Sequence, residues 1–213
     1  MRYKVLLISA ILIFPIFLTA QQFNGGAIGG MTVCKITGNP VAGGWKKIGF
    51  ILGAYVNLDV SKYSAFQIEL EYILKGALDN PDFSKGITDS YRLNLGYIEM
   101  PVLYQFKASK WLSFETGPSV NFLLHSQEEI DGNENVIVPP YSSVGLSWNI
   151  GMNINITSRL RFNFRSNNSL INTRTETVSH MVWRFWAYGE YNDIFIFAIH
   201  YRLSKLGKDP NYK

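Results

Sequence analysis

A regular alternation of apolar and polar residues is the feature that most limits the fold of this chain. It is clearest over residues 143–156, where every second residue from Val144 to Ile156 is apolar and the residues between are Gly, Ser or Asn. Successive side chains of a strand point to opposite faces of a sheet, so this period of two predicts a β-strand with one apolar face. An amphipathic helix, which needs a period near 3.6, is excluded over this stretch.

The same alternation recurs along the chain and predicts eight strands, over residues 23–34, 47–58, 65–75, 91–107, 111–124, 143–156, 160–169 and 192–203. The pattern is irregular from Tyr97 to Glu99, which indicates either a bulge there or a strand that projects beyond the membrane. The expected connections are alternately short (59–64, 108–110, 157–159) and long (35–46, 76–90, 125–141, 170–191). Outer-membrane barrels have this layout, with short periplasmic turns and long extracellular loops.

Two kinds of eight-stranded barrel fit this pattern, and composition separates them. A soluble barrel of the lipocalin kind would turn its polar face to water and carry many Lys and Glu residues there. Charged residues are only 17% of this chain, against about a quarter in an ordinary soluble domain, and the polar faces are mostly Gly, Ser and Asn. We therefore predict an all-β fold: an eight-stranded antiparallel up-and-down transmembrane β-barrel.

The first twenty residues have the pattern of a secretory signal peptide. Arg2 and Lys4 precede an apolar run over 5–18, and Leu18-Thr19-Ala20 forms a loose cleavage motif. An N-terminal anchor helix is the alternative, but this run is short for a span of roughly 20 residues and contains Pro15. We expect a signal peptide over 1–20 that is cleaved on export, an outer-membrane barrel over 21–203 and a polar tail over 204–213.

Three adjacent stretches resemble one family of barrels. Residues 96–106 look like the Leu-Glu-Ile-Pro-Leu strand of the PorT-like outer-membrane barrels of Bacteroidetes, and residues 112–118 are similar to that family's next strand with its Gly-Pro pair. Residues 66–76 match its Gln-x-Glu-Leu-x-Tyr-x-x-Lys-Gly pattern. The resemblance implies the barrel fold and the outer membrane. The founding branch takes part in type IX protein secretion and gliding, so the resemblance also implies a role in such an assembly.

The strand phase places ionisable residues on the inward face. These candidate lumen residues are Glu69, Glu71, Glu99, Glu115, Arg161, Arg165, His200 and Arg202, with Lys75 beside them. An unpaired charge in a narrow lumen is costly, so we expect carboxylates and cations to pair across it as a plug. A proton or ion path, or paired carboxylates for hydrolysis, is the alternative, but no nucleophile or metal pattern accompanies the glutamates.

Two segments of the expected outer loops stand out. Trp183, Phe185, Trp186 and Tyr188 form a candidate interaction patch, because exposed aromatic residues often mark contact sites. The alternative is that the last strands extend outward and these aromatics belong to the outer girdle. The acidic run over 128–134 is expected to be a solvated loop tip, with cation binding as the alternative.

Other functions find little support. His125, His180 and His200 are far apart and Cys34 is the single cysteine, so no metal site, cofactor or internal disulfide is expected. The basic residues are scattered, which disfavours nucleic acid. We expect a non-enzymatic anchor or accessory barrel whose partners are outer-membrane lipid and envelope lipoproteins or secretion components. The alternatives are a lipid-modifying or proteolytic barrel and a surface-binding or adhesion barrel; a passive pore conflicts with the charged interior.

Overall fold

The structure is a computed structural model that describes residues 22–39, 44–81, 84, 89–135, 140–174, 182–184 and 187–206. The predicted signal peptide lies outside the described residues, as do His180, Phe185, Trp186 and the last seven positions, 207–213. Among the residues described, no helix is long and apolar enough to cross a membrane.

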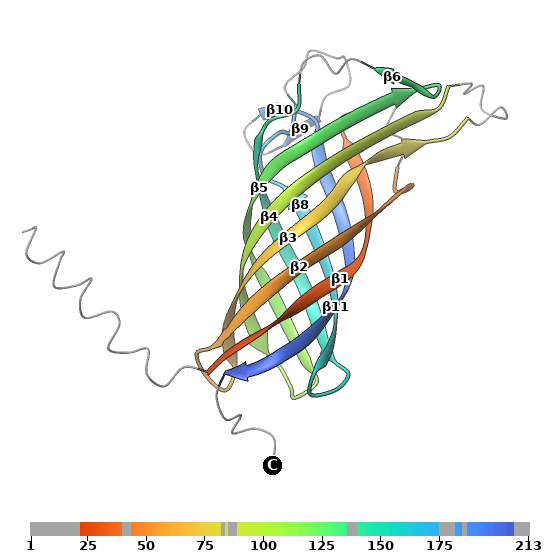
Figure 1. The fold of residues 1–213 in the computed structure, drawn as a ribbon. Helices are drawn as coiled ribbons and strands as arrows, with labels where there is room; N and C mark the ends of the chain where they lie inside the picture. The colour runs from red at the N-terminus through yellow and green to blue at the C-terminus, as the bar shows by residue number, and fades with distance from the viewer. Residues whose placement is uncertain are drawn as a thin grey trace, which may run out of the picture.

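Eight long antiparallel strands form a closed barrel (Figure 1). They are β1 (Gln22–Thr37), β2 (Lys47–Asp59), β3 (Ser64–Asp79), β4 (Tyr91–Lys107), β5 (Leu112–Ile130), β7 (Val144–Asn155), β8 (Leu160–Ser169) and β11 (Tyr191–Leu206). Each strand pairs with the next one along the chain, and β1 pairs with β11, which closes the sheet. The predicted eight-stranded up-and-down barrel is confirmed.

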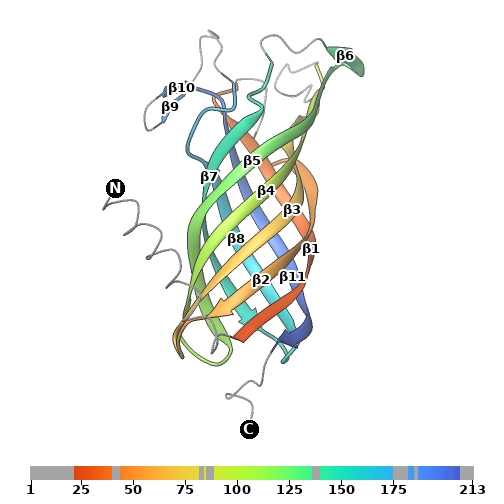
Figure 2. The same cartoon turned by 60° about the vertical axis from the view of Figure 1, so that its left-hand side comes forward.

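Three short strands lie at the long-loop end of the barrel (Figures 1 and 2). β6 (Asn133–Asn135) pairs with β5, and β9 (Val182–Arg184) pairs with β10 (Ala187–Gly189) in a separate hairpin. β1 begins and β11 ends at the opposite, short-turn end (Figure 1). The last strand runs to Leu206, three residues past the end expected from the sequence.

Glycines allow the closing strands to approach each other. A side chain on Gly26 would place its Cβ 2.2 Å from the carbonyl oxygen of Tyr201, and one on Gly30 would lie 2.3 Å from that of Phe197. Only glycine fits such a close approach. The register of β1 against β11 also shifts between Gly25 and Gly26, so the seam of the barrel depends on this glycine-rich strand.

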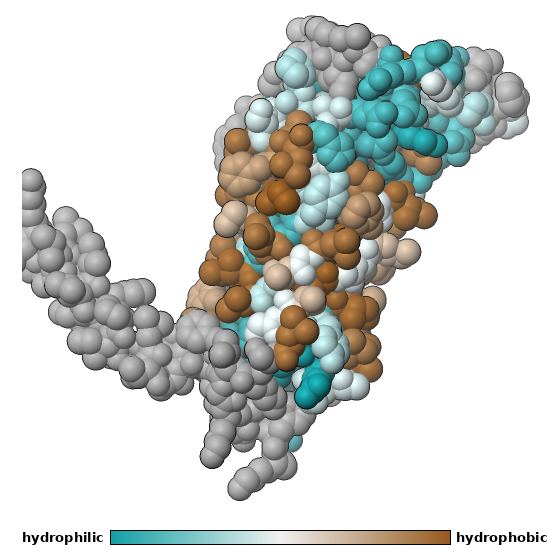
Figure 3. Space-filling model, viewed as in Figure 1, coloured by the Kyte–Doolittle hydropathy of each residue, from teal (hydrophilic) through white to brown (hydrophobic). Residues whose placement is uncertain are grey.

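The strands are longer than predicted on one side of the barrel. β5 continues to Ile130, where its last residues pair with β4 (Tyr91 opposite Ile130), and the turn lies at Asp131 and Gly132, both at positive φ. The expected solvated loop tip is therefore wrong for residues 128–130, which are strand. These strand ends project beyond the rest of the barrel (Figure 1) and carry hydrophilic residues on the outer surface (Figure 3). Residues 125–130 of β5 show no alternation of apolar and polar residues, so this extension gave no signal of period two. The irregularity predicted near Tyr97 is confirmed as a register shift between Gly96 and Tyr97.

Apolar side chains cover the outside of the wall. Leu52 is 57% exposed and Ile150 61%, and alternate residues of every neighbouring strand are similarly open (Figure 3). Residues on this face include Ile48, Phe50, Val56, Phe66, Ile68, Leu70, Val102, Phe114, Val120, Phe122 and Trp148. A lipid-facing band of this kind surrounds the barrels that span outer membranes.

The lumen holds two kinds of core. Toward the long-loop ends of the strands it is filled by buried apolar residues, which include Cys34, Ile36, Ile51, Ile73, Leu93, Leu95, Ile194 and Ile196. The Thr32 hydroxyl donates to the carbonyl oxygen of Leu74 at 2.9 Å, so β3 leans onto β1 across the strand between them. Farther toward the short turns the interior is polar. The expected polar plug thus occupies only part of the lumen.

Candidate functional site

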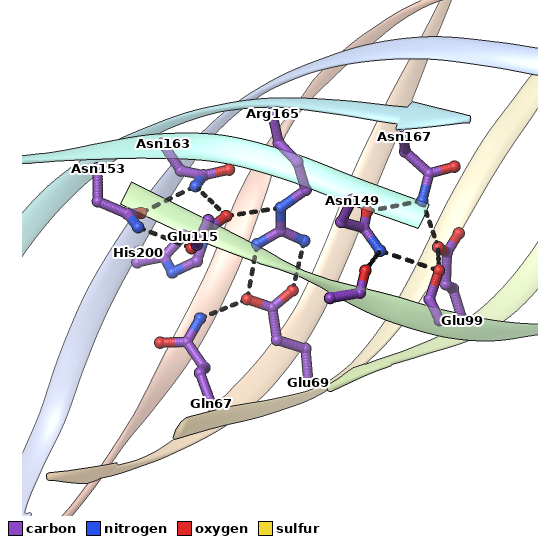
Figure 4. A network of polar contacts seen from close by, with 12 residues as sticks. Gln67, Glu69, Glu99, Glu115, Asn149, Asn153, Asn163, Arg165, Asn167 and His200 are labelled. Atoms are coloured by element: carbon purple, nitrogen blue, oxygen red, sulfur yellow. Dashed lines mark hydrogen bonds and ion pairs between the residues drawn. The ribbon is translucent and has the colours of Figure 1, made fainter. Parts of the chain in front are cut away.

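The guanidinium of Arg165 on β8 crosses the lumen and binds two carboxylates (Figure 4). Its Nη1 and Nη2 donate to the two oxygens of Glu69 on β3 at 2.7 and 2.8 Å, and its Nε donates to Oε1 of Glu115 on β5 at 2.8 Å. The Arg165 side chain is 1% exposed and both carboxylates are fully buried. This forked geometry is the strongest form of ion pair, and it ties three strands together.

Amide side chains supply the other donors to Glu115. Nδ2 of Asn153 and Nδ2 of Asn163 each donate to it at 2.7 Å, and Nε2 of Gln105 donates at 3.1 Å. A buried carboxylate needs several donors to offset the loss of water, and here one cation and three amides provide them. The alternate Asn residues of β7 and β8 are therefore part of the network.

A second ion pair lies nearer the apolar core. Nζ of Lys75 is 2.7 Å from Oε2 of Glu99, and both side chains are fully buried. Lys75 also donates to Oδ1 of Asn167 at 3.2 Å, and Glu99 accepts from Ser119 and from Asn167. These bonds form a second group beside the Arg165 contacts, and the two groups together make a polar layer inside the barrel (Figure 4).

The remaining predicted lumen residues occupy different places. Glu71 is buried, but neither of its carboxyl oxygens accepts a hydrogen bond from the described residues. Nη2 of Arg161 donates to Oε1 of Gln67 at 2.8 Å and lies 2.5 Å from Nδ1 of the buried His200. Arg202 lines a cavity at the short-turn end instead of joining the network.

The sequence predicted the charged residues of this network but not its amide side chains. Gln67, Gln105, Asn153, Asn163 and Asn167 bridge the ionisable groups, yet each is neutral. The available signal was their position at alternate residues of strands whose other face is apolar. Polar residues at such positions must find partners inside the barrel.

Glu71 and Glu115 are expected to respond differently to substitution. Glu71→Gln replaces an unpartnered buried carboxyl with a neutral isostere, so we expect stability to hold or to rise by about 1 kcal/mol. Glu115→Ala leaves Arg165 and three amides without their acceptor, so we expect a clear loss of stability. Urea unfolding in lipid vesicles and heat-modifiability on gels measure both. An unchanged gel shift for Glu115→Ala would contradict its packing role.

A second polar cluster lies beyond the apolar core, at the long-loop end. The Tyr91 hydroxyl donates to Oε1 of Glu128 at 2.6 Å, and the Tyr141 hydroxyl donates to Oε2 of Glu190 at 3.1 Å. Nη1 of Arg174 lies 3.3 Å from the Tyr141 hydroxyl and 3.7 Å from Oε1 of Glu128. These residues come from segments expected to be loops or loop ends, so the sequence did not group them.

Burial perturbs the titration of this outer cluster. It raises the pKa of the Glu190 carboxyl above its usual value, against the opposing effect of Arg174, and it raises the pKa of Tyr91 and of Tyr141. A folded-state pKa above the unfolded one gives stability that is present at low pH and lost as the pH rises through the folded-state value.

The stability difference between the wild type and Glu190→Gln is therefore expected to depend on pH. At pH 4 the raised pKa of Glu190 adds to the free energy of unfolding of the wild type relative to the variant. This added stability is lost as the pH rises above about 4.5, the ordinary pKa of a glutamate. Unfolding midpoints of both proteins between pH 4 and pH 7 measure the difference. A constant difference across that range would contradict the burial of this carboxyl.

An ion pair fixes the β9–β10 hairpin to the barrel rim. Nη1 and Nη2 of Arg184 donate to the two oxygens of Asp193 on β11 at 2.7 and 2.9 Å. The Tyr191 hydroxyl is 3.0 Å from the carbonyl oxygen of Arg184. Trp183 and Tyr188 sit opposite each other in this hairpin and are 59% and 66% exposed. Two of the four predicted patch residues, Trp183 and Tyr188, thus lie side by side. The other two, Phe185 and Trp186, lie outside the described residues.

The polar layer is arranged to hold the strands together. Glu69, Glu99 and Glu115 each accept from cations or amides of other strands, so their lone pairs are largely used. Within the described residues, no group of three or more His, Cys, Asp or Glu side chains is placed to hold a metal ion. Within this layer, the contacts of Arg165 with Glu69 and Glu115 join three strands across the lumen, and we call these three residues the brace.

A closed eight-stranded wall with an apolar exterior and a hydrogen-bonded interior defines an integral outer-membrane β-barrel protein. Residues 19–174 match the family described as "Outer membrane protein beta-barrel domain", and the chain belongs to that family. This family is general, and the match does not distinguish a PorT-like branch. No curated protein sequence matches the chain.

Two solved structures share the fold. The crystal structure of Neisserial surface protein A has a TM-score of 0.52 and 11% sequence identity, over 85% of this chain and 97% of that one. Ail, the attachment invasion locus protein of Yersinia pestis, solved in complex with the heparin analogue sucrose octasulfate, has a TM-score of 0.50 and 9% identity, over 85% of this chain and 99% of Ail. At such identities the likeness shows the fold alone.

Proposed function

We propose that this protein is a non-enzymatic outer-membrane barrel that anchors, or is an accessory part of, a cell-envelope or protein-secretion assembly. The observation that carries the proposal is the brace of Arg165, Glu69 and Glu115, which uses the interior groups to join strands. The contacts with partners would then be made by the outer end, the periplasmic turns and the tail. The resemblance to PorT-like barrels favours a type IX-like assembly, and we take residues 1–20 to be a signal peptide removed on export.

A blocked lumen agrees with this role and disfavours a pore. Arg165 spans from β8 to β3 and β5, and the apolar core fills the lumen beyond it. We therefore expect no stepwise conductance from the purified protein in planar lipid bilayers. A general porin reconstituted in the same bilayers is the control. Reproducible single-channel steps would contradict a closed lumen.

Affinity purification tests the assembly role. The tagged protein is isolated from detergent-solubilised outer membranes of cells that make it, and co-purifying proteins are identified. We expect a fixed set of envelope lipoproteins or secretion components. Isolation as a lone barrel with acyl-transferase or protease activity would overturn the proposal in favour of an enzyme.

Surface binding is the second candidate, favoured by the exposed pair Trp183 and Tyr188 on a hairpin held by Arg184 and Asp193. Rigid exposed aromatics at an outer rim suit recognition of another surface. Trp183→Ala and Tyr188→Ala are then expected to abolish binding of cells to an immobilised sulfated glycan while leaving the purified complex unchanged. Loss of the complex instead would assign the hairpin to the assembly.

A further inference from the structure

A cavity of about 670 Å³ lies at the short-turn end of the barrel, on the periplasmic side. Its walls come from the lower ends of the strands and from all three short turns. Six cationic side chains line it, and we call this space the basic vestibule: Lys62, Lys107, Lys110, Arg159, Arg161 and Arg202. One carboxylate, Asp59, shares the lining.

Among the described residues, most of these cations have no carboxylate partner. Asp59 is taken by Lys107, whose Nζ lies 2.6 Å from Oδ1 of the carboxylate. In the part of the chain that the structure describes, Lys110, Arg159 and Arg202 form no ion pair. The backbone N–H of Arg202 donates to the carbonyl oxygen of Arg159 at 2.8 Å, so these two arginines are neighbours in the fold.

Arg161 adds an independent sign of a missing partner. Its guanidinium lies 5.2 Å from the centre of the Tyr55 ring, and Nη2 is occupied by Gln67 and His200. The Nε atom is buried and has no acceptor among the described residues. A buried N–H without an acceptor is costly, so an acceptor from outside the chain fits this position.

We propose that the basic vestibule binds a small anion that carries several phosphate groups. Cations that line one low-dielectric concavity add their fields and concentrate anions there. Guanidinium forks match phosphate oxygens, and the volume lies in the range of small-ligand sites, about 300–1,000 Å³. Lys62, Lys110 and Arg159 stand on the three separate turns and the other three cations on strand ends around the cavity. This arrangement surrounds a compact polyanion and does not follow an extended chain.

Tripolyphosphate is the probe for the first experiment. The full-length protein is purified in a neutral detergent and titrated by isothermal calorimetry at low ionic strength and again at 0.15 M salt. We expect saturable binding at one site, weakened by salt because exposed charges are screened. Arg159→Gln and Arg202→Gln are each expected to weaken binding about tenfold, as the loss of one charge-assisted hydrogen bond implies.

The matched control is Arg92→Gln, which removes an exposed arginine at the long-loop end. Its affinity for tripolyphosphate is expected to equal that of the wild type. Heat-modifiability on gels shows whether each variant is folded. Arg159 lies in the turn between β7 and β8, so its substitution is expected to leave the wall intact. Absence of saturable binding by the wild type, or equal weakening by all three variants, would overturn the proposal.

A second experiment distinguishes two possible sources of the phosphate groups, a lipid headgroup and a soluble compound. The protein is placed in nanodiscs of zwitterionic lipid alone or with phosphatidylglycerol, and tripolyphosphate is titrated into both. Weaker apparent binding with the anionic lipid identifies a lipid headgroup as a competing occupant, and equal binding identifies a soluble phosphate compound. Tighter binding of a hexaglutamate peptide than of tripolyphosphate would overturn the phosphate assignment.

Discussion

Arg165→Gln is expected to lower the free energy of unfolding by about 3–5 kcal/mol. The substitution removes all three donors that Arg165 supplies and leaves Glu69 and Glu115 buried with fewer partners. The penalty comes mainly from the carboxylates left behind, since Glu69 forms no ion pair with any other cation among the described residues. Urea unfolding in lipid vesicles, followed by tryptophan fluorescence, measures the loss.

A triple variant shows whether the loss of stability comes from the unpaired carboxylates or from a general disruption of packing. Adding Glu69→Gln and Glu115→Gln to Arg165→Gln removes the stranded charges, so the triple variant is expected to recover part of the lost stability. Arg92→Gln, at the exposed long-loop end, is the control and is expected to have little effect. A single variant Arg165→Gln as stable as the control would show that the brace does not hold the strands.

Leu52→Arg is expected to have the second large effect, about 2–4 kcal/mol. Leu52 points outward from β2 between Ile48 and Val56, near the middle of the apolar band. A guanidinium there must lie in hydrocarbon or distort the bilayer around it. The yield of folded protein inserted into lipid vesicles and the unfolding midpoint both report this cost.

Val60→Arg is the matched control for the membrane placement. Val60 is 52% exposed, nearly as open as Leu52, but lies in the short turn after β2. At the interface the same side chain is expected to cost about 0–1 kcal/mol, since its charge reaches water. Equal effects of the two substitutions would contradict a lipid-facing band centred on Leu52.

The sequence was sufficient for the wall and insufficient for its extensions. A strand with lipid on one side and a packed lumen on the other must alternate, and residues 143–156 show this directly. The end of β5, residues 125–130, shows no such alternation, so this extension was not predicted. Glu128 is buried there by Tyr91 and Arg174, a contact between segments that pair only in the folded barrel.

The site was predictable in kind but not in detail. Strand phase placed Arg165, Glu69 and Glu115 in the lumen, and the cost of buried charge indicated pairing. Which carboxylate meets which cation depends on strand stagger, which a period of two does not specify. The basic vestibule was missed for a similar reason, because Lys62, Lys110 and Arg159 are scattered along the sequence and converge only where the short turns meet.

The brace also bears on the order in which the barrel forms and comes apart. Arg165 and Glu69 are separated by 96 positions along the chain, with three other wall strands paired between them. Their contact becomes available only when both strands are in place, so it belongs to the last stage of assembly and not to its rate-limiting start. Interactions formed after the transition state slow unfolding and leave the folding rate nearly unchanged. The brace is therefore expected to act as a latch that prolongs the lifetime of the inserted barrel.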